Sequence, residues 1–231
     1  MHDGWIGDFL LPAEEAARSV SESKGIFTLI DEIRANTKLS AAAHWSDANK
    51  IRDGLIARAP DEIIHYASQW KVGLDEIESK TAEMINANAY FNAAAQNPPK
   101  AVKYDFFYMH CLNCSIFFSS FLQQDWLSNA NKARLLEWKG RTDLAMYASR
   151  GSPKLLLDEI TTYRPKNPND GWEEVFERVR RHNDDGHAAK LLRALANGQR
   201  ECTRFEDSDA LKVKSDMWMQ MAHMGTFAGF V

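Results

Sequence analysis

The chain has 231 residues, 45% of them hydrophobic, which is enough for one large domain or two small ones with a buried core. Its 28 basic and 32 acidic residues are interspersed and leave a formal net charge of −4, which excludes the basic patch of a nucleic-acid-binding surface. Apolar runs extend over only a few residues, whereas a membrane-spanning helix needs roughly 20, so we expect no membrane partner.

Helical spacing of apolar residues dominates the first hundred residues. The opening segment 1–11 is apolar for a chain end and is expected to form a sticky patch if exposed. Pro12 is expected in the first turn of the first helix. Further helices are predicted over residues 25–34, from Ser46 through Ile56, from Pro60 onward, and from 75 to 95.

Residues 103–122, KYDFFYMHCLNCSIFFSSFL, are the segment on which a functional interpretation depends. Positions three and four apart lie on one face of a helix. One stripe of this helix therefore holds His110, Asn113, Cys114, Phe117 and Phe121. The remaining circumference is also largely apolar, and a helix of this kind is expected in the interior of a domain. We therefore predict that His110 is buried and has either a hydrogen-bond partner or a metal.

A further helix is predicted after residue 128. Ser128 or Asn129 is a suitable cap, and Gly151 is its expected end. Gly140 is an interior weak point, because glycine disfavours helix. Ser152 and Pro153 then have the cap and first-position order that is typical of a new helix.

A linker rich in proline and turn-forming residues occupies positions 164–171. Helices are predicted on its far side over residues 171–181 and 187–197, with a break at 183–186. No alternating strand pattern of useful length occurs. The predicted fold class is therefore all-α, a multi-helix bundle-like single domain over residues 1–231.

Cys111 and Cys114 form a C-x-x-C pattern, which occurs in redox pairs and in zinc sites. The sequence has neither the second cysteine pair of a structural zinc site nor the preceding strand of a thioredoxin-like motif. We interpret both as packing residues. The odd total of three cysteines argues against a disulfide framework, so a reducing, cytoplasmic location is expected.

His187 and Lys190 lie on one face of the first turn of a predicted helix. The positive end of the helix dipole disfavours imidazolium, which keeps His187 neutral and available as a ligand. A protonated lysine repels a metal, so Lys190 could serve only after desolvation or after conversion to a carbamate by carbon dioxide. Histidines with a carbamate form a nitrogen and oxygen set that suits iron or zinc. The same spacing is also typical of a solvated helix start.

Several long segments carry a family likeness. They are APDEIIHYASQW, KTAEMINANAYF, FFYMHCLNCSIFF, LLEWKGRTDLAMYASRGSPKLLLDEI and DDGHAAKLLRALANG. Together they resemble the questin-oxidase-like family of fungal aromatic polyketide pathways. The resemblance implies an oxidoreductase that uses molecular oxygen to open anthraquinone-type rings, by a Baeyer-Villiger-like insertion or a dioxygenase route, with a planar aromatic polyketide as its small-molecule partner.

The resemblance also implies a non-haem iron site. Its ligands on this chain would be His110, His187 and carbamylated Lys190, with Lys139 as the second choice for the modified lysine. Aromatic residues that would line the ring pocket are Phe107, Phe117 and Trp138. No catalytic residue is assigned, and NADPH is implied by the family alone, since no nucleotide-binding motif is present.

Members of this family are typically about twice as long, and this chain resembles their C-terminal half. The resemblance therefore implies a further partner, either the missing N-terminal half or a second copy of the chain. The alternative is a truncated, catalytically inactive helical binding or scaffold module. Substrate, metal identity and oligomeric state do not follow from the sequence.

Overall fold

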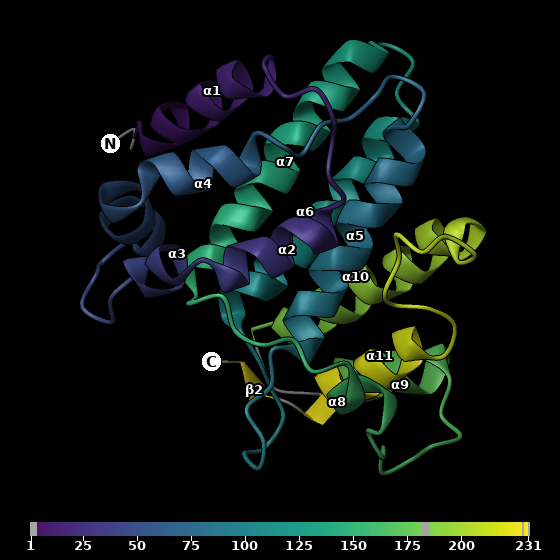
Figure 1. Ribbon diagram of the computed structural model, residues 1–231. Helices are drawn as coiled ribbons and strands as arrows, with labels where there is room; N and C mark the ends of the chain where they lie inside the picture. The colour runs from purple at the N-terminus through teal and green to yellow at the C-terminus, as the bar shows by residue number, and fades with distance from the viewer. Residues whose placement is uncertain (1–3, 182–184, 228, 231) are drawn as a thin grey trace. The chain divides into compact units, whose positions relative to one another are not determined.

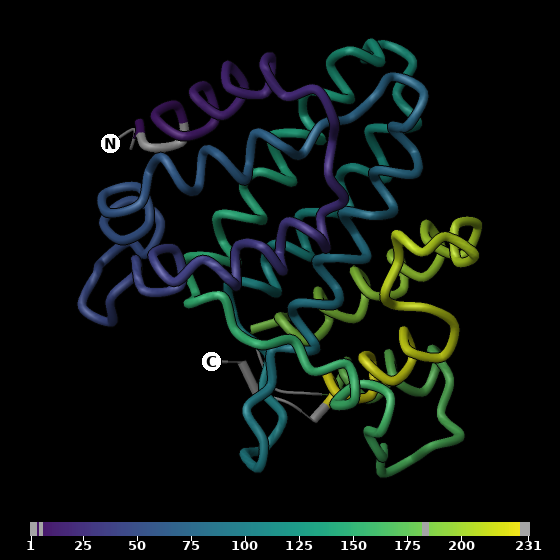
Figure 2. Tube along the Cα trace, viewed as in Figure 1, coloured from purple at the N-terminus to yellow at the C-terminus, as the bar shows by residue number. Residues whose placement is uncertain are grey.

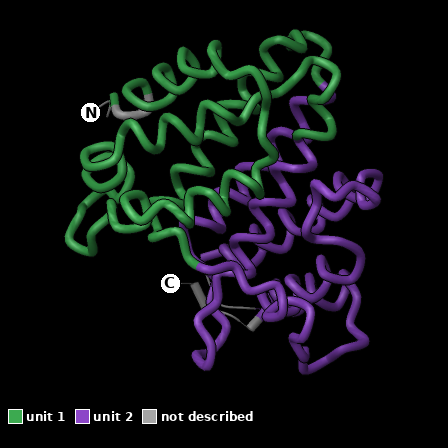
Figure 3. The backbone as a smooth tube through the Cα atoms, viewed as in Figure 1, with its two compact units in different colours: residues 1–80, 124–153 green, residues 81–123, 154–231 purple. Residues whose placement is uncertain are grey.

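A computed structural model describes residues 4–181, 185–227 and 229–230 of the chain. They form two compact units, residues 1–80 with 124–153 and residues 81–123 with 154–231 (Figure 3). The predicted break at 183–186 falls partly on residues 182–184, which lie outside the described residues. The all-α prediction is confirmed, and the expectation of a single domain over 1–231 stays a prediction.

Unit 1 is built around one long helix, α7 (Asn129–Ser149), with five shorter helices packed against it (Figure 1). These are α1 (Trp5–Ala17), α2 (Ile26–Ala35), α3 (Thr37–Ala42), the π-helix η1 (Lys50–Ile56) and α4 (Pro60–Ala67). Helix α2 supplies Leu29 and Ile33 to the core at the predicted spacing. Ser128 caps α7 as predicted, because its side chain accepts a hydrogen bond from the Asn131 N–H.

Gly140 in α7 marks a close approach between helix and side chain. A Cβ atom built on Gly140 would lie 2.2 Å from Nε1 of Trp70, whose side chain is fully buried. The glycine is therefore required for packing, although it weakens the helix as an isolated element.

Unit 2 contains most of α5 (Ile77–Ala94) and the remaining elements. They are β1 (Lys103–Tyr104), α6 (Phe106–Leu122), α8 (Leu157–Thr161), α9 (Trp172–Arg180), α10 (His187–Cys202), the 3₁₀ helix η2 (Thr203–Phe205), α11 (Met217–Phe227) and β2 (Gly229–Phe230). Helix α10 packs against α6, α9 and α11, so it organises this unit. The two short strands pair in parallel, and Figure 2 traces the open loop that connects α8 to α9 at the predicted linker.

Two predictions about individual helices are wrong. Pro12 lies inside α1, not in its first turn. No helix is predicted between Arg34 and Ser46, but this segment contains α3, whose N-cap Asn36 accepts a hydrogen bond from the Leu39 N–H. In the opening segment, Phe9 and Leu10 are buried, whereas Leu11 is 54% exposed.

The start predicted for the next helix, at Ser152 and Pro153, is also wrong. Gly151 and Ser152 both have positive φ values, 83° and 47°, which turn the chain away from a helical path. The N–H of Leu156 then donates to the carbonyl oxygen of Ala94. Helix α8 consequently begins only at Leu157. Within the described chain, no helix is both long and apolar enough to cross a membrane.

Candidate functional site

Helix α6 positions the first candidate ligand. It begins at Phe106 because the Asp105 side chain caps it, accepting hydrogen bonds from the N–H groups of Phe107 and Tyr108 at 2.9 and 3.1 Å. One face of α6 is buried in unit 2, through Tyr108, Met109, Cys111, Leu112, Ser115, Phe118 and Ser119. The packing against α10 thus fixes how the helix is rotated.

The prediction that His110 is buried is wrong. His110 and Cys114 are exposed, and Phe107 and Phe117 on the same face leave 45% and 61% of their surface in solvent. Because apolar residues lie all round α6, the sequence does not show which side of this helix faces α10. The small polar residues Ser115 and Ser119 lie on the buried side, where Ser119 accepts a hydrogen bond from Asn197 of α10.

The structure brings His110 and His187 together. Their ring centroids lie 5.5 Å apart with the ring planes at 80°. The ring of Phe106 contacts both, at centroid distances of 4.5 Å to His110 and 5.1 Å to His187. Two residues that are 77 positions apart in the sequence therefore form one aromatic and imidazole cluster within unit 2.

The loop before α10 orients His187. Gly186 adopts a left-handed conformation with φ of 86°, which glycine takes without strain, and α10 begins at the next residue. The Asp185 carboxylate contacts Nδ1 of His187, and this hydrogen bond is the main reason that the pKa of Asp185 is lowered. A carboxylate on Nδ1 favours the tautomer in which Nε2 is free of a proton and can act as a ligand.

Lys190 lies close enough to act electrostatically on His110. Neighbouring side chains desolvate the His110 ring, and this lowers its pKa; the charges of His187 and Lys190 lower it further. His110 is therefore held in the neutral form, which is the form that binds metals. Lys190 itself is exposed on α10.

These residues would supply only part of a metal site. Across the described ranges, no group of three or more His, Cys, Asp and Glu side chains is placed to hold a metal ion. His110 and His187 provide two imidazole nitrogens, and a metal would need at least one further donor. A carbamate on Lys190 would supply an anionic oxygen donor of this kind, and the charge of Lys190 acts on His110.

Lys139, the second choice for the modified lysine, lies in α7 of unit 1. Its ammonium group contacts both carboxylate oxygens of Asp143, and both side chains are buried. The ion pair with the Asp143 carboxylate engages the same amine that would have to react with carbon dioxide. This pairing favours an ion-pair role for Lys139.

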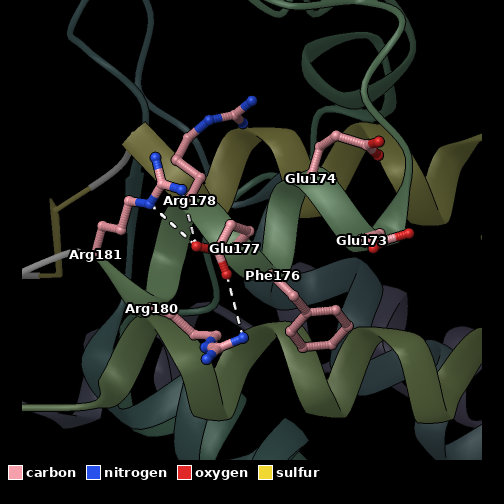
Figure 4. A pocket seen from close by; sticks show the side chains of 7 residues that line it. All are labelled: Glu173, Glu174, Phe176, Glu177, Arg178, Arg180 and Arg181. Carbon is pink, nitrogen blue, oxygen red and sulfur yellow. Dashed lines mark hydrogen bonds and ion pairs between the residues drawn. The ribbon is translucent and has the colours of Figure 1, made fainter.

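Two hollows lie elsewhere in the described chain. The larger, about 760 Å³, runs along α9, where Glu177 pairs with Arg180 and Arg181 (Figure 4). The smaller, about 230 Å³, lies on α7 in unit 1 and is lined in part by Trp138. The Arg134 guanidinium carbon lies 4.6 Å from the centroid of the Trp138 ring. Neither is lined by Phe107 or Phe117, which are exposed on α6.

Sequence reasoning missed two members of the cluster, Phe106 and Asp185. Phe106 lies four residues before His110, a spacing that places both side chains on one helix face. Asp185 lies two residues before His187, where a short carboxylate can reach the imidazole. Both spacings are visible in the sequence, but only the contact between α6 and α10 shows that these residues belong to one cluster.

Comparisons with known proteins agree on one family. The sequence model of the family described as Questin oxidase-like matches residues 1–195, which include His110, His187 and Lys190. Among similar proteins, Baeyer-Villiger monooxygenase dmxR6 of Cryptosporiopsis sp. is 43% identical over 208 residues, covering 87% of this chain and 47% of the relative.

Two further relatives show the same pattern of coverage. Baeyer-Villiger oxidase ptaJ of Pestalotiopsis fici is 41% identical over 230 residues, covering 96% of this chain and 52% of the relative. Questin oxidase of Aspergillus fumigatus is 37% identical over 234 residues, again covering 96% and 52%. The chain thus spans about half the length of the curated relatives it matches.

Proposed function

Because the chain belongs to the questin oxidase-like family, we propose that it takes part in the oxygen-dependent opening of an anthraquinone-type polyketide ring. The relatives named as Baeyer-Villiger oxidases and questin oxidase support this class of reaction. The observation that carries the proposal for this chain is the contact between His110 and His187, which both lie within the residues that match the family. The charge of Lys190 acts on His110.

In this proposal a non-haem iron is held by His110, His187 and carbamylated Lys190. When bound, the iron supplies activation of molecular oxygen. Asp185 orients His187 through Nδ1 and so presents Nε2 to the metal. The lowered pKa of His110 keeps its nitrogen lone pair available at neutral pH.

The substrate is proposed to be a planar quinone. Insertion of one oxygen atom beside a quinone carbonyl reduces the second oxygen atom to water and consumes two electrons, which NADPH would supply. A dioxygenase route places both oxygen atoms in the product and needs no reductant. The exposed rings of Phe107 and Phe117 on α6 offer aromatic surface for such a ligand.

A competing candidate is a helical module that binds without catalysis. This candidate predicts that the folded chain holds no metal. We propose the cytoplasm as the location for either candidate.

Metal content tests the proposal. Protein purified without chelators is analysed by elemental mass spectrometry, together with His110→Ala and a control, His65→Ala, which removes an exposed histidine of α4. We expect stoichiometric iron in the wild type and in His65→Ala, and its loss in His110→Ala. Folded wild-type protein without iron would contradict the claim that this chain alone holds the metal and would favour the binding module.

A further inference from the structure

Trp45 stands out on the surface of unit 1. It lies on the loop between α3 and η1, and 94% of its side chain is exposed. Single exposed apolar residues are normal on a protein surface. Tryptophan is nevertheless enriched among the residues that anchor protein contacts, because its large ring buries much apolar area and its N–H bonds to a partner. Trp45 is therefore a candidate anchor if its loop holds it in place.

The loop that carries Trp45 is fixed by its own hydrogen bonds. The Lys50 ammonium group donates to the carbonyl oxygens of residues 44, 45 and 47, at 2.7, 2.6 and 2.9 Å. The Asp47 carboxylate accepts a hydrogen bond from the His44 N–H and two from the Arg58 guanidinium, the latter both at 2.8 Å. Binding costs less when the contacting groups are already ordered, so this loop presents Trp45 as a preformed anchor.

Unit 1 also carries a hollow of suitable size for an aromatic side chain. It is the smaller hollow described above, here called the α7 hollow, with a volume of about 230 Å³. Its lining residues are Leu127, Asn131, Arg134, Leu135 and Trp138. Pockets for small molecules usually measure about 300–1,000 Å³. The α7 hollow is therefore better suited to a single side chain than to a ligand of several fused rings.

The lining of the α7 hollow matches the chemistry of an indole. Leu127 and Leu135 offer apolar contact, and Asn131 offers an amide oxygen that can accept a hydrogen bond from an indole N–H. The Arg134 guanidinium carbon lies 4.6 Å from the centroid of the Trp138 ring, and a second indole ring can contact the same cation. The hollow thus combines apolar walls, a hydrogen-bond acceptor and a cation for the ring face.

The anchor and the hollow lie in different parts of unit 1. In Figure 1 the loop between α3 and η1 projects on the left, whereas the chain enters α7 at the upper right. Trp45 therefore does not reach the hollow of its own chain. We propose that Trp45 of one copy docks into the α7 hollow of a second copy. Because two different patches meet, the contact is heterologous.

A single anchor predicts a weak contact. An aromatic side chain buries about 150–250 Å², whereas a stable interface buries more than roughly 1,000 Å². We therefore expect a dissociation constant on the order of 100 μM. The inference goes beyond the proposed function, because anchor and hollow lie in unit 1, whereas His110 and His187 lie in unit 2. Self-association and iron binding can thus fail independently.

Sedimentation equilibrium of the full chain tests the contact, at up to about 1 mM protein. We expect the average mass of the wild type to rise with concentration. Trp45→Ala removes the anchor and should weaken the contact by about thirtyfold. Leu135→Asp places a charge in the α7 hollow and should have the same effect. Leu74→Ala, at another exposed side chain of unit 1, is the control and should associate like the wild type.

A mixture of the two variants distinguishes this contact from a symmetric one. Trp45→Ala keeps the hollow and Leu135→Asp keeps the anchor, so one contact can form between them. We expect a one-to-one complex in the mixture, with the affinity of the wild-type contact. Leu135→Ala is made in parallel, and circular dichroism of every variant ensures that a loss of association is read only from folded protein.

Each outcome decides the proposal. A wild type that stays monomeric at the highest concentration overturns it, as does unchanged association of either variant, which would assign self-association to another surface. Two folded variants that lose association and form no mixed complex also overturn it. A mixed complex together with an unchanged control supports it. Iron content is measured on the same samples: association without iron supports the contact and contradicts the proposed function, whereas iron without association does the reverse.

Discussion

The imidazole of His110 on α6 lies against that of His187, the first residue of α10, with ring centroids 5.5 Å apart. This contact exists because α10 packs along α6 and because Gly186 turns the chain just before the helix begins. It converts two histidines that are individually unremarkable in the sequence into one site. The metal binding that we propose for this pair would therefore depend on the groups that orient each ring.

Asp185→Asn tests the orientation of His187. The amide keeps the size of the side chain but removes the charge that contacts Nδ1, so His187 is less firmly held in the tautomer that presents Nε2. We expect about a tenfold loss of affinity for zinc, used as a redox-inert probe in calorimetric titration. Asp209→Asn, at an exposed position of unit 2, is the control. Equal zinc affinity in both variants would show that Asp185 does not support the site.

Gly140→Ala tests the close approach of Trp70 to α7. Alanine favours a helix by about 1 kcal/mol over glycine. Here the added Cβ would lie 2.2 Å from Trp70 Nε1, and relief of that clash must displace a fully buried ring. We expect a net loss of about 1–3 kcal/mol in the free energy of unfolding, measured by urea denaturation.

Gly7→Ala is the control for that experiment. Gly7 lies in α1, and no heavy atom lies within 4 Å of the Cβ it would gain. The same substitution should therefore be neutral or stabilising there. A Gly140→Ala protein as stable as Gly7→Ala would mean that Trp70 moves aside without cost.

The helices were predictable from sequence to the extent that their signals are local. The apolar spacing of α2, the proline that opens α4 and the cap of α7 all arise within a few residues of the chain. The predictions that failed concern features that depend on tertiary structure. The rotation of α6 depends on α10, and the late start of α8 depends on backbone turns at 151 and 152.

The candidate site shows the same division. Spacing places His187 and Lys190 on one helix face, but no local pattern connects them with His110. The family resemblance supplied that connection, and the fold supplied its geometry. Phe106 was overlooked because an aromatic residue four positions from a histidine is read as core unless a second ring is known to meet both.

Lys139→Met tests whether this lysine is an ion-pair partner or a modified ligand. Asp143 is 1% exposed, so loss of the lysine removes an ammonium group that contacts a carboxylate in the interior. We expect a loss of about 3–5 kcal/mol in the free energy of unfolding, and recovery of most of it in Lys139→Met/Asp143→Leu. Iron content should be unaffected in whichever variant folds. A stable single variant that loses iron would instead assign Lys139 to the metal site.

The burial of His223 in α11 indicates how the stability of the chain depends on pH. Its side chain is 2% exposed, and within the described part of the chain its Nδ1 atom has no hydrogen-bond partner. Burial lowers the pKa of His223, and the positive charge of Arg178 lowers it further. The folded chain therefore holds this imidazole neutral at pH values where the unfolded chain, with a pKa near 6.5, already binds a proton.

The sign follows from proton binding. As the pH falls below about 6.5, His223 binds a proton in the unfolded state but not in the folded state. The free energy of unfolding therefore decreases until the pH reaches the lower pKa of His223 in the folded state. The contribution of this residue has a slope of at most about 1.4 kcal/mol per pH unit. We expect urea midpoints to fall between pH 7 and pH 5, and to fall less steeply in His223→Leu. His65→Leu, at an exposed histidine, should keep the wild-type slope, and an unchanged slope in His223→Leu would place the acid sensitivity elsewhere.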